Sequence, residues 1–403
     1  METHFKAVKI TDEVYWVGAI DWLIRDFHGY ATGRGSTYNA YLIMAEDITL
    51  IDTVKAPFRD EMMGRIASVV DPKKIKIIVS NHSEMDHSGC LPEVIDDIRP
   101  EKVYSSVMGE KTLVDHFHER IAGKVIPVKD GEAVSLGNMK LVFAETRMLH
   151  WPDSMIAFLP ERSLLFSQDA FGMHLASFER FDDQIDQSIL DYEAGKYYAN
   201  IIMPYANLVT KLLERVPATG WDIKLVAPDH GPVWRSKIPW ILERYARWAS
   251  GVPENRAVVV YDTMWQSTAR MARAIGEGLS AGGTETKIMP MAAHHRSDVV
   301  TEILAAGALV VGSPTLNNNI FPTLADLMVY MKGLKPKGLV GAAFGSYGWS
   351  GESVAHLNGL LSEMKVDLVG EGIKVKNVPT GDDLAGCFSL GRKTSDILKG
   401  KTK

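Results

Sequence analysis

A short polar segment at residues 250–255, which contains Gly251 and Pro253, divides the chain into two unlike parts. It follows an aromatic-rich helical pattern at 238–249 and precedes the entirely apolar run 257–261, which is typical of a buried parallel strand. Nine of the 12 histidines occur before residue 231, so candidate metal ligands are concentrated in the first part. We therefore expect two domains, residues 1–250 and 254–403, in line with roughly 150 residues per domain.

The second part alternates regularly between strand and helix patterns. Strand-like segments at 258–261, 286–288, 308–311 and 339–343 are separated by helical patterns at 268–281, 297–306 and 323–334. Such alternation predicts an α/β domain with a doubly wound parallel sheet.

The composition excludes several classes of partner and site. The chain has 44 Lys and Arg against 50 Asp and Glu and no long basic run, so neither nucleic acid nor an anionic membrane is expected as a partner. No stretch approaches about 18 consecutive apolar residues, and the first residues contain no apolar signal core. Cys90 and Cys387 are too few for a disulfide framework or a cysteine-ligated zinc or iron–sulfur centre. We expect a cytoplasmic protein without a membrane span.

Four metal-competent side chains, His82, Glu84, Asp86 and His87, occur within six residues directly after the apolar run 75–79. Alone, this segment could be a polar loop that opens a helix, with an acidic or hydroxyl residue as its cap. The density of imidazole and carboxylate groups favours a metal site, because neutral imidazoles bind metal ions while carboxylates balance charge and bridge.

Three further candidate ligands follow later predicted strands in the first part. His150 follows the run 139–143, Asp169 follows 163–166, and His230 follows 224–226. Sheets of α/β type assemble sites from side chains at strand ends, so we expect these residues to meet the first four.

Three loops of the second part, each after a predicted strand, favour a bound flavin. They combine hydroxyl, Gly, amide and aromatic residues, which suit a phosphate at a helix N-terminus and a flat ring held by stacking. The candidate FMN-binding residues are Thr263, Met264, Trp265, Gln266, Ser267, Thr268, Ser313, Pro314, Thr315, Leu316, Asn317, Asn318, Ser346, Tyr347, Gly348 and Trp349. The first loop resembles the flavodoxin phosphate loop, although Trp265 and Gln266 replace a hydroxyl residue and a Gly.

The order His-x-Glu-x-Asp-His, then His, Asp and His, followed by the flavin loops, resembles the flavodiiron proteins (A-type flavoproteins) over nearly the whole chain. This resemblance implies an N-terminal metallo-β-lactamase-like αββα sandwich followed by a flavodoxin-like domain. Most zinc hydrolases of that first fold have His where this chain has Glu84, and the harder oxygen donor suits iron better than zinc.

The resemblance also implies roles for individual residues. One iron would be bound by His82, Glu84 and His150. The other would be bound by Asp86 and His230, with His87 as a further candidate and Asp169 as the bridge. His28 and Tyr198 resemble the pair that faces the open iron positions, but a buried structural His and a core Tyr remain equally compatible with the residues alone.

The implied activity is reduction of O2 to water, of NO to N2O, or both. Electrons would come through FMN from a separate donor such as rubredoxin, in a head-to-tail homodimer or a dimer of dimers. Two alternatives remain, namely a zinc hydrolase of the metallo-β-lactamase fold fused to a flavodoxin-like domain, and an electron carrier whose first domain is an inert scaffold.

Overall fold

The computed structural model describes residues 4–402 and divides them into two compact units. The first unit comprises residues up to His28 together with 32–197 and 207–246, and the second comprises 29–31, 198–206 and the chain from Arg247 onwards. The main division lies a few residues before the predicted boundary. Nothing in the sequence pattern indicated that the two short segments would group with the second unit.

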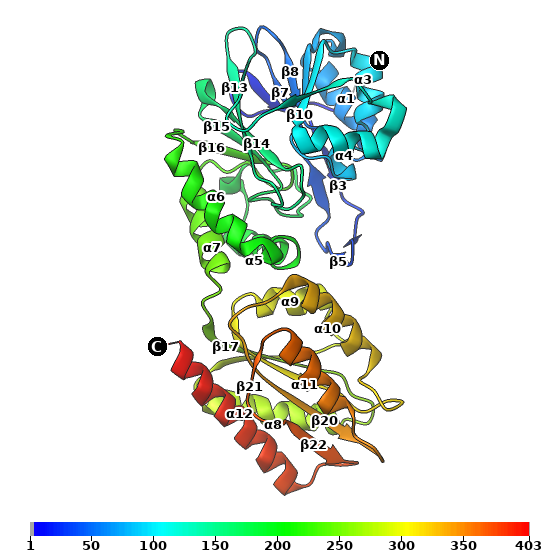
Figure 1. The fold of residues 1–403 in the computed structure, drawn as a ribbon, viewed down its shortest axis with the longest axis vertical. Helices are drawn as coiled ribbons and strands as arrows, with labels where there is room; N and C mark the ends of the chain where they lie inside the picture. Colours follow the sequence, from blue (N-terminus) through cyan, green and yellow to red (C-terminus); the bar gives the residue numbers. More distant parts are fainter. Residues whose placement is uncertain (1–3, 403) are drawn as a thin grey trace. The chain divides into compact units, whose positions relative to one another are not determined.

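Two main sheets form the first unit (Figure 1). The seven-stranded sheet has, in spatial order, β1 (Val8–Lys9), β2 (Val14–Trp16), β7 (Tyr41–Ile43), β8 (Thr49–Ile51), β9 (Ile77–Ser80), β10 (Lys102–Ser106) and β11 (Val125–Val128). The five-stranded sheet has β12 (Ala133–Ser135), β13 (Lys140–Glu145), β14 (Met155–Leu159), β15 (Leu164–Gln168) and β16 (Leu225–Pro228). Short strands β3 (Ala19–Asp21), β4 (Asp26–Phe27), β5 (Tyr30–Ala31) and β6 (Ser36–Tyr38) lie between β2 and β7 in the sequence.

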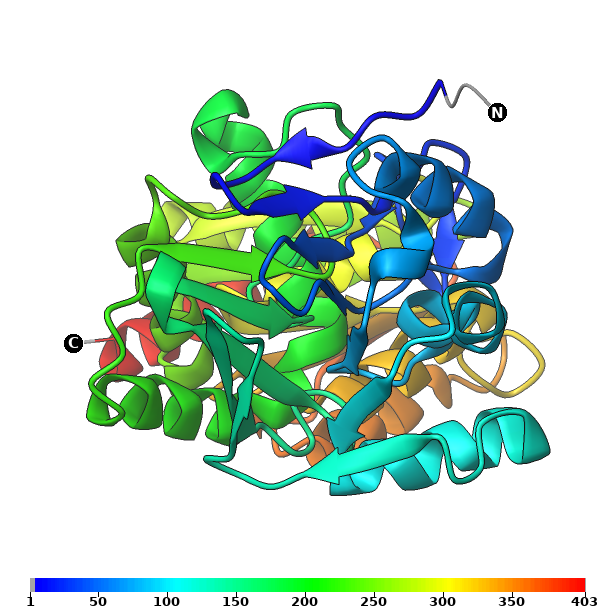
Figure 2. The ribbon, with the colours of Figure 1, turned by 90° about the horizontal axis from the view of Figure 1, so that it is seen from above.

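One apolar core joins the inner faces of these sheets, with Ile51 and Val79 from the first packed against Phe143 and Phe166 from the second. A second core lies on the other face of the seven-stranded sheet, under α1 (Arg59–Ala67), α3 (Leu91–Ile98) and α4 (Val107–Phe117). The two views in Figures 1 and 2 show these helices on the outer side of that sheet. Because the central strands are covered on both faces, β9 and β15 are buried along their whole length.

The remaining helices of the first part are α2 (Met85–Ser88), α5 (Gln187–Tyr197), α6 (Ala206–Ala218) and α7 (Ile238–Ser250). A π-helical turn, Tyr198–Ile202, continues α5. Apolar side chains of α6 and α7, among them Leu212 and Leu242, line one cavity together with Leu165 and Val226 of the five-stranded sheet. The first unit is therefore an αββα sandwich, as expected.

The second unit has a parallel sheet in the order β18 (Glu285–Pro290), β17 (Glu254–Tyr261), β19 (Ala306–Gly312), β20 (Val340–Tyr347), with β21 (Asp367–Leu368) and β22 (Ile373–Lys376) both paired to β20. Helices α8 (Ser267–Ala281) and α12 (Gly381–Lys401) cover one face, and α9 (Arg296–Ile303), α10 (Pro322–Leu334) and α11 (Ser353–Glu363) cover the other (Figure 1). This is the predicted doubly wound sheet, in flavodoxin order. Among residues 4–402, no helix combines the length and apolar character that a membrane crossing needs.

Candidate functional site

The ends of β9, β15 and β16 and the loop after β13 bring all seven predicted metal ligands together. His82 follows β9, Asp86 and His87 lie in α2, and all three are at most 4% exposed. Asp169 directly follows β15, and His230 lies two residues beyond β16, which pairs with β15 in parallel. His150 lies in the turn between β13 and β14.

The first group of ligand atoms comprises His82, Glu84, His150 and one oxygen of Asp169. The Nε2 atom of His150 lies 2.9 Å from Asp169 Oδ2 and 3.2 Å from Glu84 Oε2. The Nε2 atom of His82 lies 3.3 Å from Glu84 Oε2 and 3.4 Å from Asp169 Oδ2. Two imidazole nitrogens and two carboxylate oxygens thus converge on one point.

The second group comprises Asp86, His87 and His230, and the other oxygen of Asp169 faces it. Asp86 Oδ1 lies 3.4 Å from His87 Nε2, and Asp86 Oδ2 lies 3.2 Å from His230 Nε2. Asp169 Oδ1 lies 3.3 Å from His87 Nε2 and 3.5 Å from His230 Nε2. The carboxylate of Asp169 therefore presents one oxygen to each group, which is the geometry of a bridging ligand.

The donor set fits metal ions better than a self-contained polar core. Both oxygens of Asp86 and the Nε2 of His87 are buried, and within residues 4–402 none of them has a hydrogen-bond partner of acceptable geometry. Buried polar atoms without partners are costly, so this arrangement needs a bound group. Two adjacent sets of imidazole and carboxylate donors match a binuclear centre.

Neighbouring groups hold the imidazoles so that Nε2 points to the centre. The Nδ1 of His230 donates to the carbonyl oxygen of Thr37. The Nδ1 of His82 lies 3.5 Å from Asp153 Oδ2, which also accepts hydrogen bonds from the amide and the hydroxyl of Ser83. Partners of this kind fix the tautomer of a ligand. Asp153 was not predicted as a site residue, although a carboxylate three residues after His150 was a signal that could have identified it.

The electrostatics of the cluster are those of a metal site without its cations. Burial lowers the pKa of His150, but hydrogen bonds to Asp169 and Glu84 outweigh burial and raise it to about 9. Burial raises the pKa of Asp169, but the His87 charge and the close imidazoles of His150 and His82 hold it well below its usual value. The pocket therefore keeps its carboxylates ionised, and a metal ion would replace the protons on the imidazoles.

The two residues predicted to face the open metal positions differ in their surroundings. His28 has a side chain that is 77% exposed, with Nε2 3.6 Å from Glu84 Oε1. Tyr198 packs its ring against Trp248, with centroids 5.1 Å apart, and burial raises its pKa.

Tyr197, the residue before Tyr198, has its ring 6.0 Å from that of His230. Burial, together with the Asp169, Asp86 and Glu84 carboxylates, raises its pKa well above the usual value. The ring of Tyr197 thus lies near the ligand His230 and that of Tyr198 packs against Trp248, because consecutive helical residues point in directions about 100° apart.

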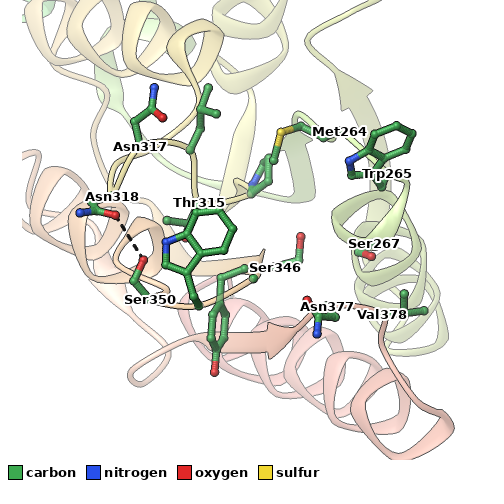
Figure 3. A pocket seen from close by; sticks show the side chains of 15 residues that line it. Met264, Trp265, Ser267, Thr315, Asn317, Asn318, Ser346, Ser350, Asn377 and Val378 are labelled. Carbon is green, nitrogen blue, oxygen red and sulfur yellow. Dashed lines mark hydrogen bonds between the residues drawn. The ribbon is translucent and has the colours of Figure 1, made fainter.

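The second unit has a cavity of about 530 Å³ at the carboxyl ends of its parallel strands (Figure 3). Ser267, at the start of α8, lies on the side of Met264 and Trp265, whereas Asn317 and Asn318 lie on the opposite side (Figure 3). Trp265 and Trp349 line the cavity with side chains that are 90% and 87% exposed. Twelve predicted residues line it, namely Met264, Trp265, Ser267, Pro314, Thr315, Leu316, Asn317, Asn318, Ser346, Tyr347, Gly348 and Trp349.

The other four predicted residues support the wall. Thr268 and Ser346 share a hydrogen bond of 2.8 Å between their hydroxyls, and Ser313 accepts one of 2.9 Å from the amide of Phe321. Gln266 adopts a left-handed conformation, φ +67°, where the chain turns into α8. The hydroxyl of Thr263 is buried without a hydrogen-bond partner among residues 4–402, as expected of a donor meant for a ligand.

Three lining residues were missed from the sequence: Ser350, Asn377 and Val378. Ser350 donates to Asn318 at 3.4 Å (Figure 3). Asn377 follows β22 and donates its amide to the carbonyl oxygen of Tyr347 at 2.7 Å. The position of β22 at the end of β20 is a property of the folded sheet, so no local sequence signal marked these two residues after it. A cavity with exposed aromatic rings, a helix N-terminus and an unpaired hydroxyl fits FMN.

Comparisons with known proteins agree with the folds of both units. Residues 37–231 match the ODP family beta lactamase, and residues 259–391 match flavodoxin. The chain is 46% identical to a nitric oxide reductase of Moorella thermoacetica, over 96% of this chain and 97% of the relative.

Two solved structures have the same fold along the whole chain. The rubredoxin oxygen:oxidoreductase of Desulfovibrio gigas is 44% identical with a TM-score of 0.96, covering 98% of this chain and 99% of that one. The flavodiiron protein of Giardia intestinalis is 32% identical with a TM-score of 0.95, covering 99% and 98%. The relatives named by activity are oxidoreductases, so the zinc hydrolase is not favoured. The chain therefore belongs to the flavodiiron proteins, a family of oxidoreductases.

Proposed function

We propose that this protein reduces O2 to water, NO to N2O, or both, at two irons in the first unit, with electrons passed through FMN in the second. The observation that carries this proposal is the Asp169 carboxylate, whose two oxygens face two separate buried ligand groups. The names of the relatives, nitric oxide reductase and rubredoxin oxygen:oxidoreductase, agree with both substrates.

One iron would be held by His82, Glu84 and His150, and the second by Asp86, His87 and His230, with Asp169 facing both. The three carboxylates balance most of the charge of two ferrous ions, and Glu84 supplies a hard oxygen donor that favours iron over zinc. When bound, the iron pair supplies electrons and coordination positions for the diatomic substrate, and the flavin accepts electrons from the donor.

Two side chains beside the ligands act on protons and on the bound substrate. Reduction of O2 or NO consumes protons, and the exposed imidazole of His28 lies between solvent and Glu84, where it can pass protons inward. The raised pKa of Tyr197 keeps its phenol protonated, so that it can donate a hydrogen bond at the centre. Tyr198 has a packing role against Trp248.

FMN occupies the cavity at the ends of β17, β19 and β20. The start of α8 and the hydroxyls of Thr263 and Ser267 bind the phosphate, because helix N-terminal amides and hydroxyls are anion donors. Trp349, which the cavity leaves exposed, contacts the ring.

The electron donor is a separate protein of the rubredoxin type, and the active species is a head-to-tail homodimer or a dimer of such dimers. Electron delivery requires the flavin and the irons to be close, and a two-fold axis pairs the flavin of one chain with the irons of the other, twice. The location is the cytoplasm, since Cys90 and Cys387 are both buried free thiols, as in a reducing compartment.

The function is tested on purified holoprotein by metal and flavin analysis and by anaerobic turnover with reduced rubredoxin, with O2 and NO compared side by side. We expect about two irons and one FMN per chain. Stoichiometric zinc in a protein with full oxidase activity would contradict the iron assignment.

The dimer is tested by mixing chains in which His82 is replaced by Asn with chains that cannot bind FMN. Each parent dimer is inactive, whereas a mixed dimer retains one complete flavin-to-iron pair. If mixed dimers are shown to form and remain inactive, electrons do not cross between chains.

A further inference from the structure

The turn that carries His28 joins two very short strands. β4 ends at Phe27 and β5 begins at Tyr30, so His28 and Gly29 form the two-residue turn of a hairpin. Their φ angles are +56° and +82°, as a type I′ turn requires, and His adopts such a conformation far less readily than Gly. Each strand has only two residues, and an isolated hairpin is at best marginally stable, so this turn needs bonds from other parts of the molecule.

Arg296, the first residue of α9, supplies one of these bonds. Residues 29–31 belong to the second unit, as does α9. The Nε of Arg296 donates to the carbonyl oxygen of Gly29 at 3.1 Å. The guanidinium lies so close to Gly29 that a Cβ atom there would overlap its Nη2. A side chain at this position would therefore be strained at its φ and would displace Arg296.

The guanidinium of Arg296 is itself fixed from two sides. Its Nη1 is paired with the carboxylate of Asp326, and its central carbon lies 5.0 Å from the centroid of the Tyr330 ring. Both of these residues belong to α10. The planar fork of an arginine can serve a carboxylate, an aromatic face and a carbonyl oxygen at once, which the compact ammonium of a lysine cannot do. Arg296 therefore links the turn to α10 in one defined geometry.

Ser297, the next residue of α9, holds the chain two residues beyond Gly29. Its hydroxyl is buried and accepts a hydrogen bond of 3.1 Å from the amide of Ala31. Asn200, in a segment that also belongs to the second unit, donates its Nδ2 to the carbonyl oxygen of Ser297 at 3.2 Å and thereby anchors this turn of the helix. Two adjacent residues of α9 thus fix the chain at the first and third positions after His28.

The imidazole of His28 depends on this turn for its place beside the metal ligands. Its Nε2 lies 3.6 Å from Oε1 of Glu84, and its ring packs against that of Phe27 with centroids 4.4 Å apart. The side chain is 77% exposed, so packing restricts it little, and the backbone of the turn decides where it points. A displacement of about 1 Å in a group that acts on a reaction can lower the rate by about 100-fold. A turn free to move would therefore take the imidazole away from Glu84.

We propose that Arg296 is a positioning residue of the metal site, whose guanidinium holds the His28–Gly29 turn so that the imidazole stays beside Glu84. The inference rests on the proposed function, in which His28 passes protons inward. Arg296 acts on the reaction only through His28. The unit that holds FMN in the proposed function thereby also supports the supply of protons to the metal site.

The first test needs no activity. Crystal structures of the holoprotein compare Arg296→Met, which keeps an unbranched side chain without charge or donor, with Arg273→Met, the matched change at an exposed arginine of α8. We expect Arg296→Met to shift residues 28–31 by about 1 Å or more, or to disorder them, while Arg273→Met leaves them in place. A His28 imidazole that keeps its wild-type position in Arg296→Met would overturn the proposal.

The second test is a double-mutant cycle in steady-state turnover with Arg296→Met, His28→Asn and the variant that combines them. Asn tolerates the positive φ of His28 but is shorter, and its amide does not exchange a proton as an imidazole does. We expect Arg296→Met to lower kcat by about fivefold or more with an unchanged KM for rubredoxin, and His28→Asn to lower kcat by about tenfold or more. The combined variant should equal His28→Asn, because a positioning residue has no effect once the group it positions is gone. Losses of kcat that multiply in the combined variant would show that Arg296 does not act through His28.

The outcomes separate this inference from the proposed function. A wild-type holoprotein that reduces neither O2 nor NO refutes the proposed function, and the crystal structures still decide whether Arg296 holds the turn. If the holoprotein is active and His28→Asn turns over at the wild-type rate, His28 has no part in the reaction and the positioning role is refuted, while the reduction of O2 or NO stands. If Arg296→Met does not fold, Arg296→Lys replaces it in both tests, since an ammonium can bind Asp326 or Gly29 but not both.

Discussion

Replacing Ser267 by Asp should weaken FMN binding through charge alone, and Ser267→Asn provides the matched neutral control. Ser267 is the first residue of α8, is 8% exposed and lines the flavin cavity. Asp and Asn have nearly the same shape, and both can cap a helix. The difference between the two variants therefore isolates the repulsion between a carboxylate and the FMN phosphate, which carries about 1.5 to 2 negative charges at pH 7.

The loss of FMN binding free energy in the Asp variant can be calculated from the position of Ser267. Two unit charges 4 Å apart interact by about 4 kcal/mol at an effective dielectric constant of about 20, which suits a site near the protein surface. The new carboxylate turns away to about 7 Å, where one pair of charges interacts by about 2.4 kcal/mol, and the 1.5 to 2 charges of the phosphate raise the expected loss to about 3.6–4.7 kcal/mol. This corresponds to a Kd about 400- to 3000-fold higher for the Asp variant than for the Asn variant.

Titration of apoprotein with FMN, followed by flavin fluorescence, measures both Kd values, and the gap between them should narrow as salt is added. Iron content and circular dichroism should be unchanged, because the metal ligands belong to the other unit. Equal Kd values for the Asp and Asn variants would refute the placement of the phosphate at the start of α8.

Three further predictions concern the metal centre. His150→Asn and His230→Asn should each abolish turnover and lower iron content while leaving the flavin spectrum intact. Metal analysis and absorbance measure these effects. Turnover that survives would show that the ligand assignment is wrong. Carboxylates raise the pKa of His150 to about 9 despite burial, so below that pH a proton competes with iron for the imidazole. The affinity of the apoprotein for ferrous iron should therefore rise from pH 6 towards pH 9. A titration that gives the same affinity at every pH would contradict this prediction. Tyr197→Phe should lower kcat by about tenfold or more, while Tyr198→Phe leaves kcat nearly unchanged. If steady-state assays show the larger loss of kcat in Tyr198→Phe, Tyr198 is the tyrosine that acts at the centre.

The fold of the second part could be predicted because it depends on a pattern that is local in the chain, whereas the αββα sandwich of the first part was predicted from the family resemblance of its ligand motif. After residue 257, apolar strand segments alternate with helical segments, and this alternation predicts a parallel sheet with helices on both faces. Four of the ligands could be predicted for a related reason. His82, Glu84, Asp86 and His87 lie within six residues of the chain, so they are close together in any fold. The loops at 263–268, 313–318 and 346–349 were likewise marked by their position after apolar runs.

The sequence by itself determined which side chains were available, but the tertiary structure decided which way they point and what they join. Asp169 faces both ligand groups because β15 and β16 pair in parallel and place it beside His230. The ring of Tyr197 lies near His230 and that of Tyr198 against Trp248 because helix phase is set by packing, and the chain offers two adjacent tyrosines. Asn377 reaches the flavin cavity only because β22 pairs with the end of β20. The covalent chain fixes the local spacing of residues. Strand pairing and helix phase depend instead on burial of surfaces that are far apart in the sequence, so no single segment determines them.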